Sequence, residues 1–308
     1  MKLVTYSMNG SIFPGKLTDS GVIDIISAST PTDAPHSVKE ILSRGSKYLE
    51  QLDTLTAPVI PLNKVKLLAP IPSPGKILAL AGNYTEHITE VGLELGLSES
   101  PRNTTVPRPF IMPNTVITGP DTEISWPAYS NQLDYELELC IVIGKIAKYI
   151  DSAKALDYVA GYCIANDISA RSVSFKAQRT SRPWDEFYDW LNGKWADGFL
   201  PTGPYLLTAD EIDNVQNLDM KLTINGQTRQ QANTSQMIYP VADIVSFLSN
   251  IMTLQPGDII ATGTPAGVGM AEGRFLKADD KIQCTIEKLG TLTNTIGKKS
   301  EISYEPLL

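Results

Sequence analysis

The chain has 308 residues, of which 42% are hydrophobic and 19% are charged, and it has no apolar run of the length that spans a bilayer, so we expect a globular protein without a membrane role. The net charge of −8 disfavours binding to nucleic acid, because a phosphate backbone requires a dense cluster of Lys and Arg. An anionic small molecule would need a metal ion or a few placed basic side chains to attract it locally.

The first 63 residues predict a small α+β domain. We expect strands at residues 2–7 and 21–25, and short helices at residues 37–45 and 46–55. The start lacks a basic segment followed by an apolar core and a cleavage site, so we expect it to be part of the fold and the protein to be cytoplasmic. Prolines between residues 58 and 74 predict an extended connection, and we place the domain boundary near Asn63.

Residues 64–308 predict a second, larger domain that is mostly β. The expected strands are at residues 76–81, 109–113, 122–126, 134–145, 158–169, 219–226, 258–263, 281–287 and 291–296. Asn225-Gly226 and Gly290 mark tight hairpins, and residues 240–252 have apolar side chains at helical spacing. Because long helices do not alternate with the strands, a doubly wound parallel sheet is disfavoured, and an α+β fold with a β-roll or sandwich-like core is favoured.

Two further features concern loops and cysteines. Residues 172–199 show no obvious helix or strand and are rich in aromatic side chains, and long ordered loops of this kind often carry function. Cys140, Cys163 and Cys284 lie far apart in the sequence, each within an apolar segment that resembles a strand. We expect them to be reduced thiols in the core, without a disulfide or zinc site.

The stretch LDYELELC, residues 133–140, places acidic side chains at every second position. Asp134, Glu136 and Glu138 therefore share one face of the expected strand, since successive side chains point to opposite faces. Three neighbouring carboxylates repel one another. Either water screens them on a solvent-exposed face, or a cation holds them together.

Asp167 favours the cation. It ends an otherwise apolar predicted strand, where burial of a carboxylate without a partner is costly. Glu136 and Glu138 can chelate one hard cation from the same side, and Asp167 is the best candidate for a third oxygen ligand. Such a site leaves coordination positions for water and substrate.

His87 and Glu90 form a second candidate group, three residues apart and on one side of a helix if this segment is helical. A histidine oriented by a carboxylate can act as a general base near neutral pH, although a single histidine is often structural or merely exposed. The chain has only one other histidine, His36, in the small N-terminal domain. The glycine and asparagine before this segment suggest a mobile lid.

The loop ATGTPAGVG, residues 261–269, is a third candidate. Its glycines do not indicate a nucleotide-binding loop, because Pro265 interrupts them and no Gly-Lys-Ser/Thr follows. Its backbone N–H groups could still bind a carboxylate, and a plain turn between strands is an equally good interpretation.

Seven ordered motifs give the chain a family resemblance: GNYTEH, LDYELEL followed by VIGK, VAGYCIANDISAR, GKWADGFLPTGP, NTSQMI, LQPGD and ATGTPAGVG. Together they resemble the fumarylacetoacetate hydrolase family, over about residues 76–296. The resemblance implies a β-roll domain that forms a homodimer and binds a divalent metal, usually Mg²⁺ or Mn²⁺. The residues that match the metal ligands are Glu136, Glu138 and Asp167.

The same resemblance implies the roles of the other site residues. Those that match the acid–base pair on a lid and the active-site lysine are His87, Glu90 and Lys194. Those that match positions near a bound 2-oxo acid are Arg171, Gly263 and Thr264. One departure is that Ser172 and Ser174 stand where the family often has Asp and Gln, which puts one polar contact to the substrate in doubt.

These residues predict a metal-dependent hydrolase that cleaves a C–C bond in a small 2-oxo or 2,4-dioxo acid, such as an acylpyruvate or fumarylacetoacetate. A bound divalent ion would stabilise the enolate that such cleavage generates. Decarboxylation of oxaloacetate and isomerisation of an unsaturated 2-oxo diacid pass through the same enolate and are alternatives. A binding or scaffold protein that retains the metal is an alternative from another class, although such a protein does not need His87, Glu90 and Lys194 together.

Overall fold

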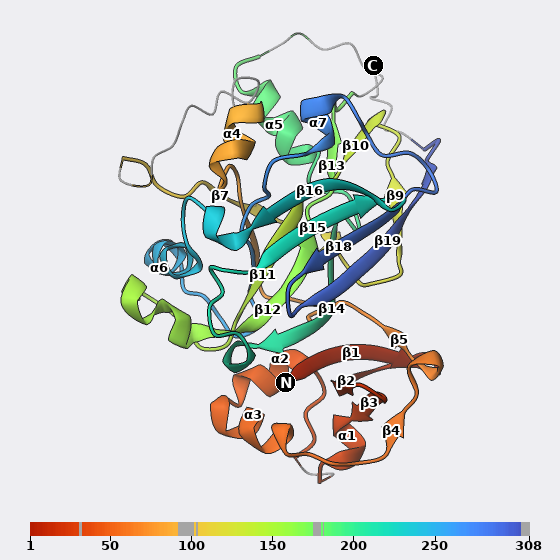
Figure 1. Cartoon of the computed structure of the whole chain (residues 1–308), viewed down its shortest axis with the longest axis vertical. Coiled ribbons are helices and arrows are strands. Elements are labelled where there is room, and N and C mark those ends of the chain that lie inside the picture. Colours follow the sequence, from red (N-terminus) through yellow and green to blue (C-terminus); the bar gives the residue numbers. More distant parts are fainter. Residues whose placement is uncertain (31–32, 92–101, 103, 175–179, 181, 303–308) are drawn as a thin grey trace.

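The computed structural model of the protein describes the chain except for residues 31–32, 92–101, 103, 175–179, 181 and 303–308 (Figure 1). The described strands form a large sheet of twelve strands, a second sheet of five and a pair of short strands. The expected α+β fold with a dominant β core is confirmed. No helix among the described residues is long and apolar enough to cross a membrane.

The N-terminal unit lies below the larger body in Figure 1. Its elements are β1 (Lys2–Met8), β2 (Ser11–Thr18), β3 (Gly21–Asp24), α1 (Ile25–Ala28), α2 (Val38–Ser43), α3 (Ser46–Asp53), β4 (Val59–Ile60), η1 (Leu62–Lys64) and β5 (Lys66–Leu67). The Ser37 hydroxyl caps α2 by accepting the Glu40 N–H at 3.1 Å. The two predicted strands and two predicted helices are confirmed.

Strand β2 was missing from the sequence prediction, because Pro14 and Gly15 interrupt the pattern of strand-forming residues. The structure explains Gly15: a Cβ there would lie 2.4 Å from Val22 Cγ1, so only glycine lets the neighbouring side chains close over the strand. Strand β1 also pairs antiparallel with β14 (Leu200–Thr208), at Leu3 opposite Leu206. The large sheet therefore runs through both parts of the chain, and the division near residue 63 stays a prediction.

The larger body contains the remaining strands. These are β6 (Ile77–Leu80), β7 (Pro109–Met112), β8 (Ile117–Thr118), β9 (Glu123–Trp126), β10 (Gln132–Asp134), β11 (Leu137–Ile143), β12 (Val159–Asn166), β13 (Ser169–Arg171), β14, β15 (Asp219–Ile224), β16 (Gln227–Asn233), β17 (Ile259–Ala261), β18 (Lys281–Ile286) and β19 (Gly290–Lys299). The path through the large sheet is β4-β3-β2-β1-β14-β12-β11-β17-β6-β7, with β5 and β8 beside it, and that of the second sheet is β16-β15-β18-β19-β9.

The two sheets pack face to face, with β11, β12 and β14 against β15, β18 and β19 (Figure 1). Strand β11 lies between β12 and β17 and is buried along its whole length, which explains its unbroken apolar run IVI. The three cysteines are buried and unpaired, as expected. The core between the sheets thus fixes the ends of β11 and β12.

Helices are few and lie at the edges of the sheets. They are α4 (Thr85–Val91), α5 (Asp185–Asn192), α6 (Val241–Ile251), α7 (Gly269–Glu272) and the 3₁₀ turns η2 (Asn114–Val116), η3 (Ser152–Tyr158), η4 (Ala209–Glu211) and η5 (Thr234–Gln236). The predicted helix at 240–252 and both hairpins are confirmed, with Asn225 and Gly226 at positive φ between β15 and β16. Val241, Ile244, Val245 and Leu248 of α6 are buried, whereas Ile251 at its end is exposed.

The prediction of no regular element in residues 172–199 was wrong for residues 185–192, which form α5. Acidic residues occupy the first turn of this helix, but no capping side chain marks its start, because Trp184 at the N-cap makes no side-chain hydrogen bond. The stretch also includes residues 175–179 and 181, which lie outside the described residues.

Candidate active site

Two breaks in neighbouring strands create the site. The sequence predicted one continuous strand at residues 134–145, but the structure divides it into β10 and β11, with Tyr135 and Glu136 between them. The partner strand divides in the same way into β12 and β13, at Asp167 and Ile168. The Asn166 side chain accepts the Glu136 N–H, and the Glu136 carbonyl accepts the Asp167 N–H, both at 2.9 Å. The two breaks therefore face each other and bring their carboxylates together.

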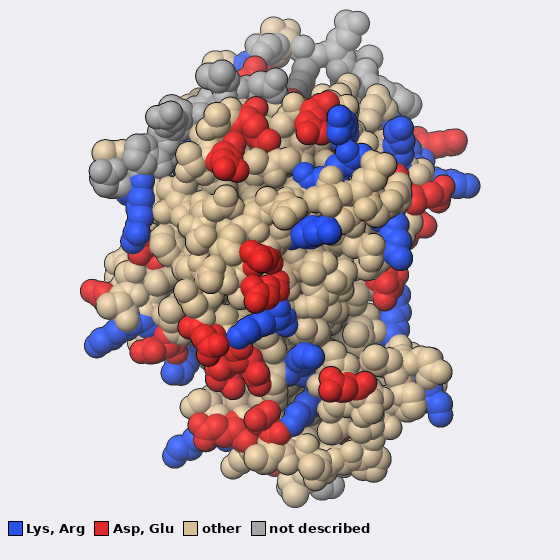
Figure 2. Space-filling model, in the orientation of Figure 1, with Lys and Arg blue, Asp and Glu red and all other residues tan. Residues whose placement is uncertain are grey.

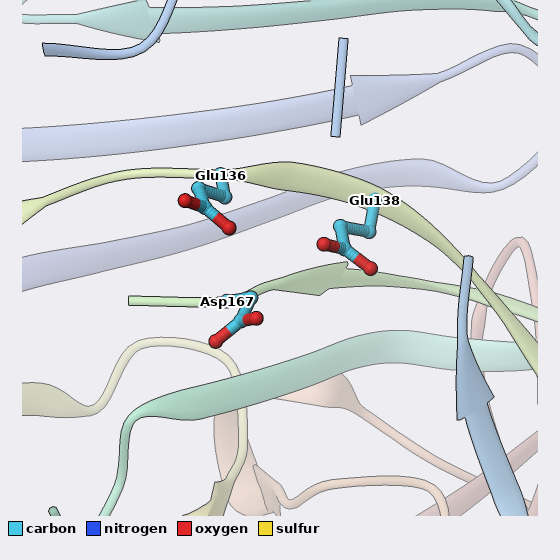
Figure 3. Close-up of side chains that lie close together, drawn as sticks. All are labelled: Glu136, Glu138 and Asp167. Carbon is cyan, nitrogen blue, oxygen red and sulfur yellow. The ribbon is translucent and has the colours of Figure 1, made fainter. Parts of the chain in front are cut away.

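Glu136, Glu138 and Asp167 converge, as Figure 3 shows. One carboxylate oxygen of each lies within 4.8 Å of the others. All three side chains are buried, with exposed fractions of 6%, 1% and 1%, so the interpretation as a solvent-exposed acidic face was wrong. The structure thus supports the alternative in which cations compensate the carboxylates.

Two basic side chains of the protein compensate part of this charge. Lys194 is 2% exposed and donates to Glu136 Oε2 at 2.6 Å and to Asp167 Oδ2 at 2.8 Å. The Arg171 guanidinium donates to Glu136 Oε1 at 2.5 Å. Both residues were expected at the site, Lys194 as the active-site lysine and Arg171 near the substrate, and here both contact a carboxylate of the triad.

Asp134, the first acid of the alternating stretch, has a separate role. It is fully buried, and it accepts the backbone N–H groups of Gly269 and Met270 at 2.6 and 3.0 Å and the Arg171 Nε–H at 3.1 Å. Arg171 therefore bridges Asp134 and Glu136. This bridge fixes the guanidinium and, through it, the carboxylate of Glu136.

The triad retains an acceptor for a metal ion. Asp167 Oδ1 is buried and, within the described part of the chain, has no hydrogen-bond partner. Glu138 Oε2 accepts a backbone N–H, from Gly263 at 2.7 Å. Three converging carboxylates with an unpartnered oxygen form the hard oxygen-donor set that Mg²⁺ and Mn²⁺ prefer, so these residues fit a divalent ion.

Burial and charge separate the pKa values of the three carboxyl groups. Burial alone would raise the pKa of Glu136, but the positive charges of Lys194 and Arg171 lower it to about 2. Burial, followed by the charge of Glu136, raises the pKa of Asp167 to about 6 despite Lys194. Burial and the charges of Asp167 and Glu136 raise the pKa of Glu138 well above its usual range. Without a metal, the two basic side chains therefore do not stabilise all three carboxyl groups in the ionised form.

His87 and Glu90 lie one turn apart on α4, as expected, with His87 Nδ1 and Glu90 Oε1 3.1 Å apart. Glu90 also accepts the Gly267 N–H, at 3.0 Å to each of its oxygens. The loop at residues 261–269 does therefore bind carboxylates through its backbone: Gly267 binds Glu90 of α4, as Gly263 binds Glu138 and Gly269 binds Asp134. The contact with Gly267 fixes Glu90, which in turn orients the imidazole of His87.

A small pocket joins these groups. It is lined by Leu80, Ala81, Gly82, His87, Phe110, Glu136, Asp167, Arg171, Trp190, Lys194 and Thr264. Thr264 reaches it as expected, whereas Gly263 contributes a backbone N–H to Glu138. Phe110 and Trp190, whose ring centroids lie 4.8 Å apart, were not among the predicted site residues. The only sequence feature that indicated Trp190 was the high content of aromatic residues in the segment 172–199. No sequence feature indicated Phe110.

Fold and site together define an enzyme of the fumarylacetoacetate hydrolase class. The family model described as Fumarylacetoacetate (FAA) hydrolase C-terminal matches residues 76–297. The chain belongs to this family, whose members include hydrolases, isomerases and tautomerases and typically bind a divalent metal.

Relatives named for different activities resemble the chain over most of its length. The mitochondrial oxaloacetate tautomerase FAHD2A of Bos taurus is 37% identical over 90% of this chain and 84% of its own. Among solved structures, the 2-hydroxyhepta-2,4-diene-1,7-dioate isomerase of Mycobacterium marinum is 30% identical, with a TM-score of 0.73 over 98% of this chain and 100% of that one. The maleylpyruvate hydrolase of Sphingobium sp. SYK-6 is 29% identical, also with a TM-score of 0.73, over 97% and 100%.

Proposed function

We propose that this enzyme binds a small 2-oxo acid beside a divalent metal ion and transfers a proton at the carbon next to the keto group. The observation that carries the proposal is the common pocket, in which His87 faces the same space as Glu136, Asp167 and Lys194. The names of the bovine tautomerase and the mycobacterial isomerase support this reaction type, since both describe a shift of protons and double bonds.

The carboxylate triad would hold the metal ion, which, when bound, would supply a Lewis acid for the keto and carboxylate oxygens of the substrate. The side chains of the enzyme do the rest. His87, oriented by Glu90, takes a proton from the carbon and returns it at a second position. Lys194 adds positive charge next to the oxygen on which negative charge develops. Phe110 and Trp190 line the same pocket and restrict water there.

Hydrolysis of a C–C bond, the reaction first expected from the sequence, is the second candidate. It uses the same proton transfers, with His87 acting on a water molecule that attacks a carbonyl carbon. The maleylpyruvate hydrolase among the similar structures supports it. We rank it second because hydrolysis requires the same side chains to position and activate an attacking water molecule in addition to the proton transfer at the substrate.

The test compares oxaloacetate keto–enol exchange with hydrolysis of acylpyruvates, in Mg²⁺ or Mn²⁺ and then in chelator. We expect His87→Ala to lower kcat by about 10²- to 10⁴-fold while the Mg²⁺ affinity is retained, because the histidine moves a proton without holding the metal. Glu136→Ala should abolish both. His36→Ala is the matched control, since His36 lies in the N-terminal unit and should leave kcat unchanged.

Equal losses of metal binding in the His87 and Glu136 variants would refute this division of roles. Turnover of no 2-oxo acid by a protein that still binds oxalate with Mg²⁺ would contradict the proposed reaction. Rapid acylpyruvate hydrolysis without oxaloacetate exchange would reverse the ranking of the two candidates.

Four further expectations belong to the proposal. The identity of the ion as Mg²⁺ or Mn²⁺ rests on the oxygen-donor set, and the homodimer rests on the family resemblance. The expected absence of nucleic-acid binding rests on charge: over the described residues on the face in Figure 2, acidic and basic side chains are interspersed. The cytoplasmic location rests on the sequence alone, and the name of the bovine relative places that protein in mitochondria.

A further inference from the structure

Gln230, on β16, has a fully buried side-chain amide behind the pocket. The reaction proposed above gives this residue no role. Its Oε1 accepts the Leu137 N–H at 2.9 Å, and its Nε2 donates to Thr264 Oγ1 and to the Pro265 carbonyl, both at 2.8 Å. Leu137 directly follows the metal-ligand candidate Glu136. One side chain therefore connects the start of β11 with the loop that carries Thr264.

The chemistry of these partners permits only one orientation of the amide. The Leu137 N–H can only donate and must face the amide oxygen, whereas the Pro265 carbonyl can only accept and must face the amide nitrogen. The second N–H of the amide then points at the Thr264 hydroxyl. Thr264 Oγ1 must accept this hydrogen bond, so its own proton cannot be directed at Gln230.

The Thr264 proton is thus left for the pocket. Among the described residues, no acceptor for this hydroxyl proton is found, and Thr264 lines the pocket together with His87 and Lys194. A hydroxyl that already accepts one hydrogen bond donates its proton more readily to an anion.

We propose that Gln230 is a positioning residue that sets the Thr264 hydroxyl as a donor to an anionic oxygen of the ligand. This inference rests on the proposed function, since it assumes that the pocket binds the carboxylate of a 2-oxo acid. It adds a residue from the five-stranded sheet to a site otherwise built from the large sheet, the β10–β13 pair and their loops.

The experiment measures the affinity of oxalate in the presence of Mg²⁺ by calorimetry. We expect Thr264→Val to weaken oxalate binding by about tenfold or more, as for the loss of a hydrogen bond to a charged group, and Thr264→Ser to retain it within about twofold. Gln230→Glu should weaken binding by a similar factor, because an ionised carboxylate accepts the Thr264 proton and turns it away from the ligand. In the Thr264→Val background, the Gln230→Glu change should have almost no further effect on oxalate affinity.

Gln216→Glu is the matched control. Gln216 also joins two backbone groups, the Val241 N–H at 2.7 Å and the Thr234 carbonyl at 2.9 Å, but it does not line the pocket. We expect this variant to lose thermal stability while oxalate affinity stays within about twofold of the wild type. If Gln230→Glu does not fold, the same cycle with Gln230→Met applies, with a weaker but still Thr264-dependent effect.

Two results would overturn the inference: oxalate affinity unchanged in a folded Gln230 variant, or losses at positions 230 and 264 that multiply in the double variant. Failure of the proposed function would look different, because the wild type itself would then not bind oxalate with Mg²⁺.

Discussion

At the scale of single residues, Lys194 shows how a protein side chain can neutralise the same buried carboxylates that a metal ion would bind. Its ammonium group lies within 2.8 Å of two buried carboxylates, and burial of the lysine would lower its pKa if Asp167 and Glu136 did not raise it. Because the partners hold it charged, the lysine acts in the apo protein as a built-in cation. Its removal should make the fold depend on the metal.

We therefore expect Lys194→Met to lower the stability of the metal-free protein by about 3–5 kcal/mol, since it leaves Glu136 and Asp167 without their shared partner. Added Mg²⁺ should restore more stability in this variant than in the wild type, because the ion enters a site with uncompensated charge. Thermal unfolding in chelator and in Mg²⁺ measures both effects.

Lys76→Met is the matched control for this prediction. Lys76 also pairs with a buried carboxylate, Asp258, at 2.6 Å, but Asp258 is not part of the triad. The control variant should lose stability without gaining a larger response to Mg²⁺. The same Mg²⁺ response in both lysine variants would show that Lys194 does not substitute for the ion.

At the scale of elements, the site residues were more predictable than the elements that hold them. The alternation of Asp134, Glu136 and Glu138 predicted that these acids share one side of a strand. In the structure Glu136 and Glu138 do converge, although the strand breaks after β10. The break itself depends on the Asn166 side chain, thirty positions away in the sequence, which accepts the Glu136 N–H. Local periodicity does not include such a partner, so the strand was predicted as continuous.

The same limit explains Asp134, Gln230 and α5. The sequence placed Asp134 on one face with Glu136 and Glu138 and gave it no role of its own, whereas in the structure it binds the start of α7 and Arg171, both of which only the fold brings close. Gln230 is one of several glutamines in β16 and the neighbouring sequence. Nothing in the sequence distinguishes this buried glutamine from its exposed neighbours. Helix α5 has no capping residue that would mark its start. Each was missed because long-range packing decides its role.

Gly267 gives a prediction at this scale. Its φ is +100°, and an added Cβ would lie 2.3 Å from the Arg229 carbonyl oxygen, so alanine there must push the loop away from β16. We expect Gly267→Ala to destabilise the fold by about 2–4 kcal/mol through backbone strain and overpacking, and to lower kcat, because its N–H fixes Glu90. Thermal unfolding and steady-state kinetics measure the two effects.

Gly226 provides the comparison, since it also has positive φ but an added Cβ meets nothing within 4 Å. Gly226→Ala should cost only about 1 kcal/mol and leave kcat unchanged. Full activity in a folded Gly267→Ala variant would mean that the contact between α4 and the loop is not needed for catalysis.

At the scale of the whole molecule, the buried triad makes global stability depend on pH. The pKa of Asp167 is raised from 3.8 to about 6 in the folded state, chiefly by burial. Between these values the folded protein binds a proton that the unfolded chain has released, so its stability falls as pH rises from about 4 to 6. The shift to a pKa of about 2 for Glu136 acts in the opposite sense, but below this range.

In chelator, we therefore expect wild-type stability to carry a penalty from Asp167 that grows to about 3 kcal/mol above pH 6. Asp167→Asn should remove this penalty, since its amide does not ionise and no longer raises the pKa of Glu138. The unfolding free energy of both proteins between pH 4.5 and 7.5 gives the difference directly. Mg²⁺ should reverse the trend in the wild type alone, because a divalent ion binds the ionised carboxylates. Identical pH profiles of the two proteins in chelator would mean that the triad is already neutralised without a metal ion.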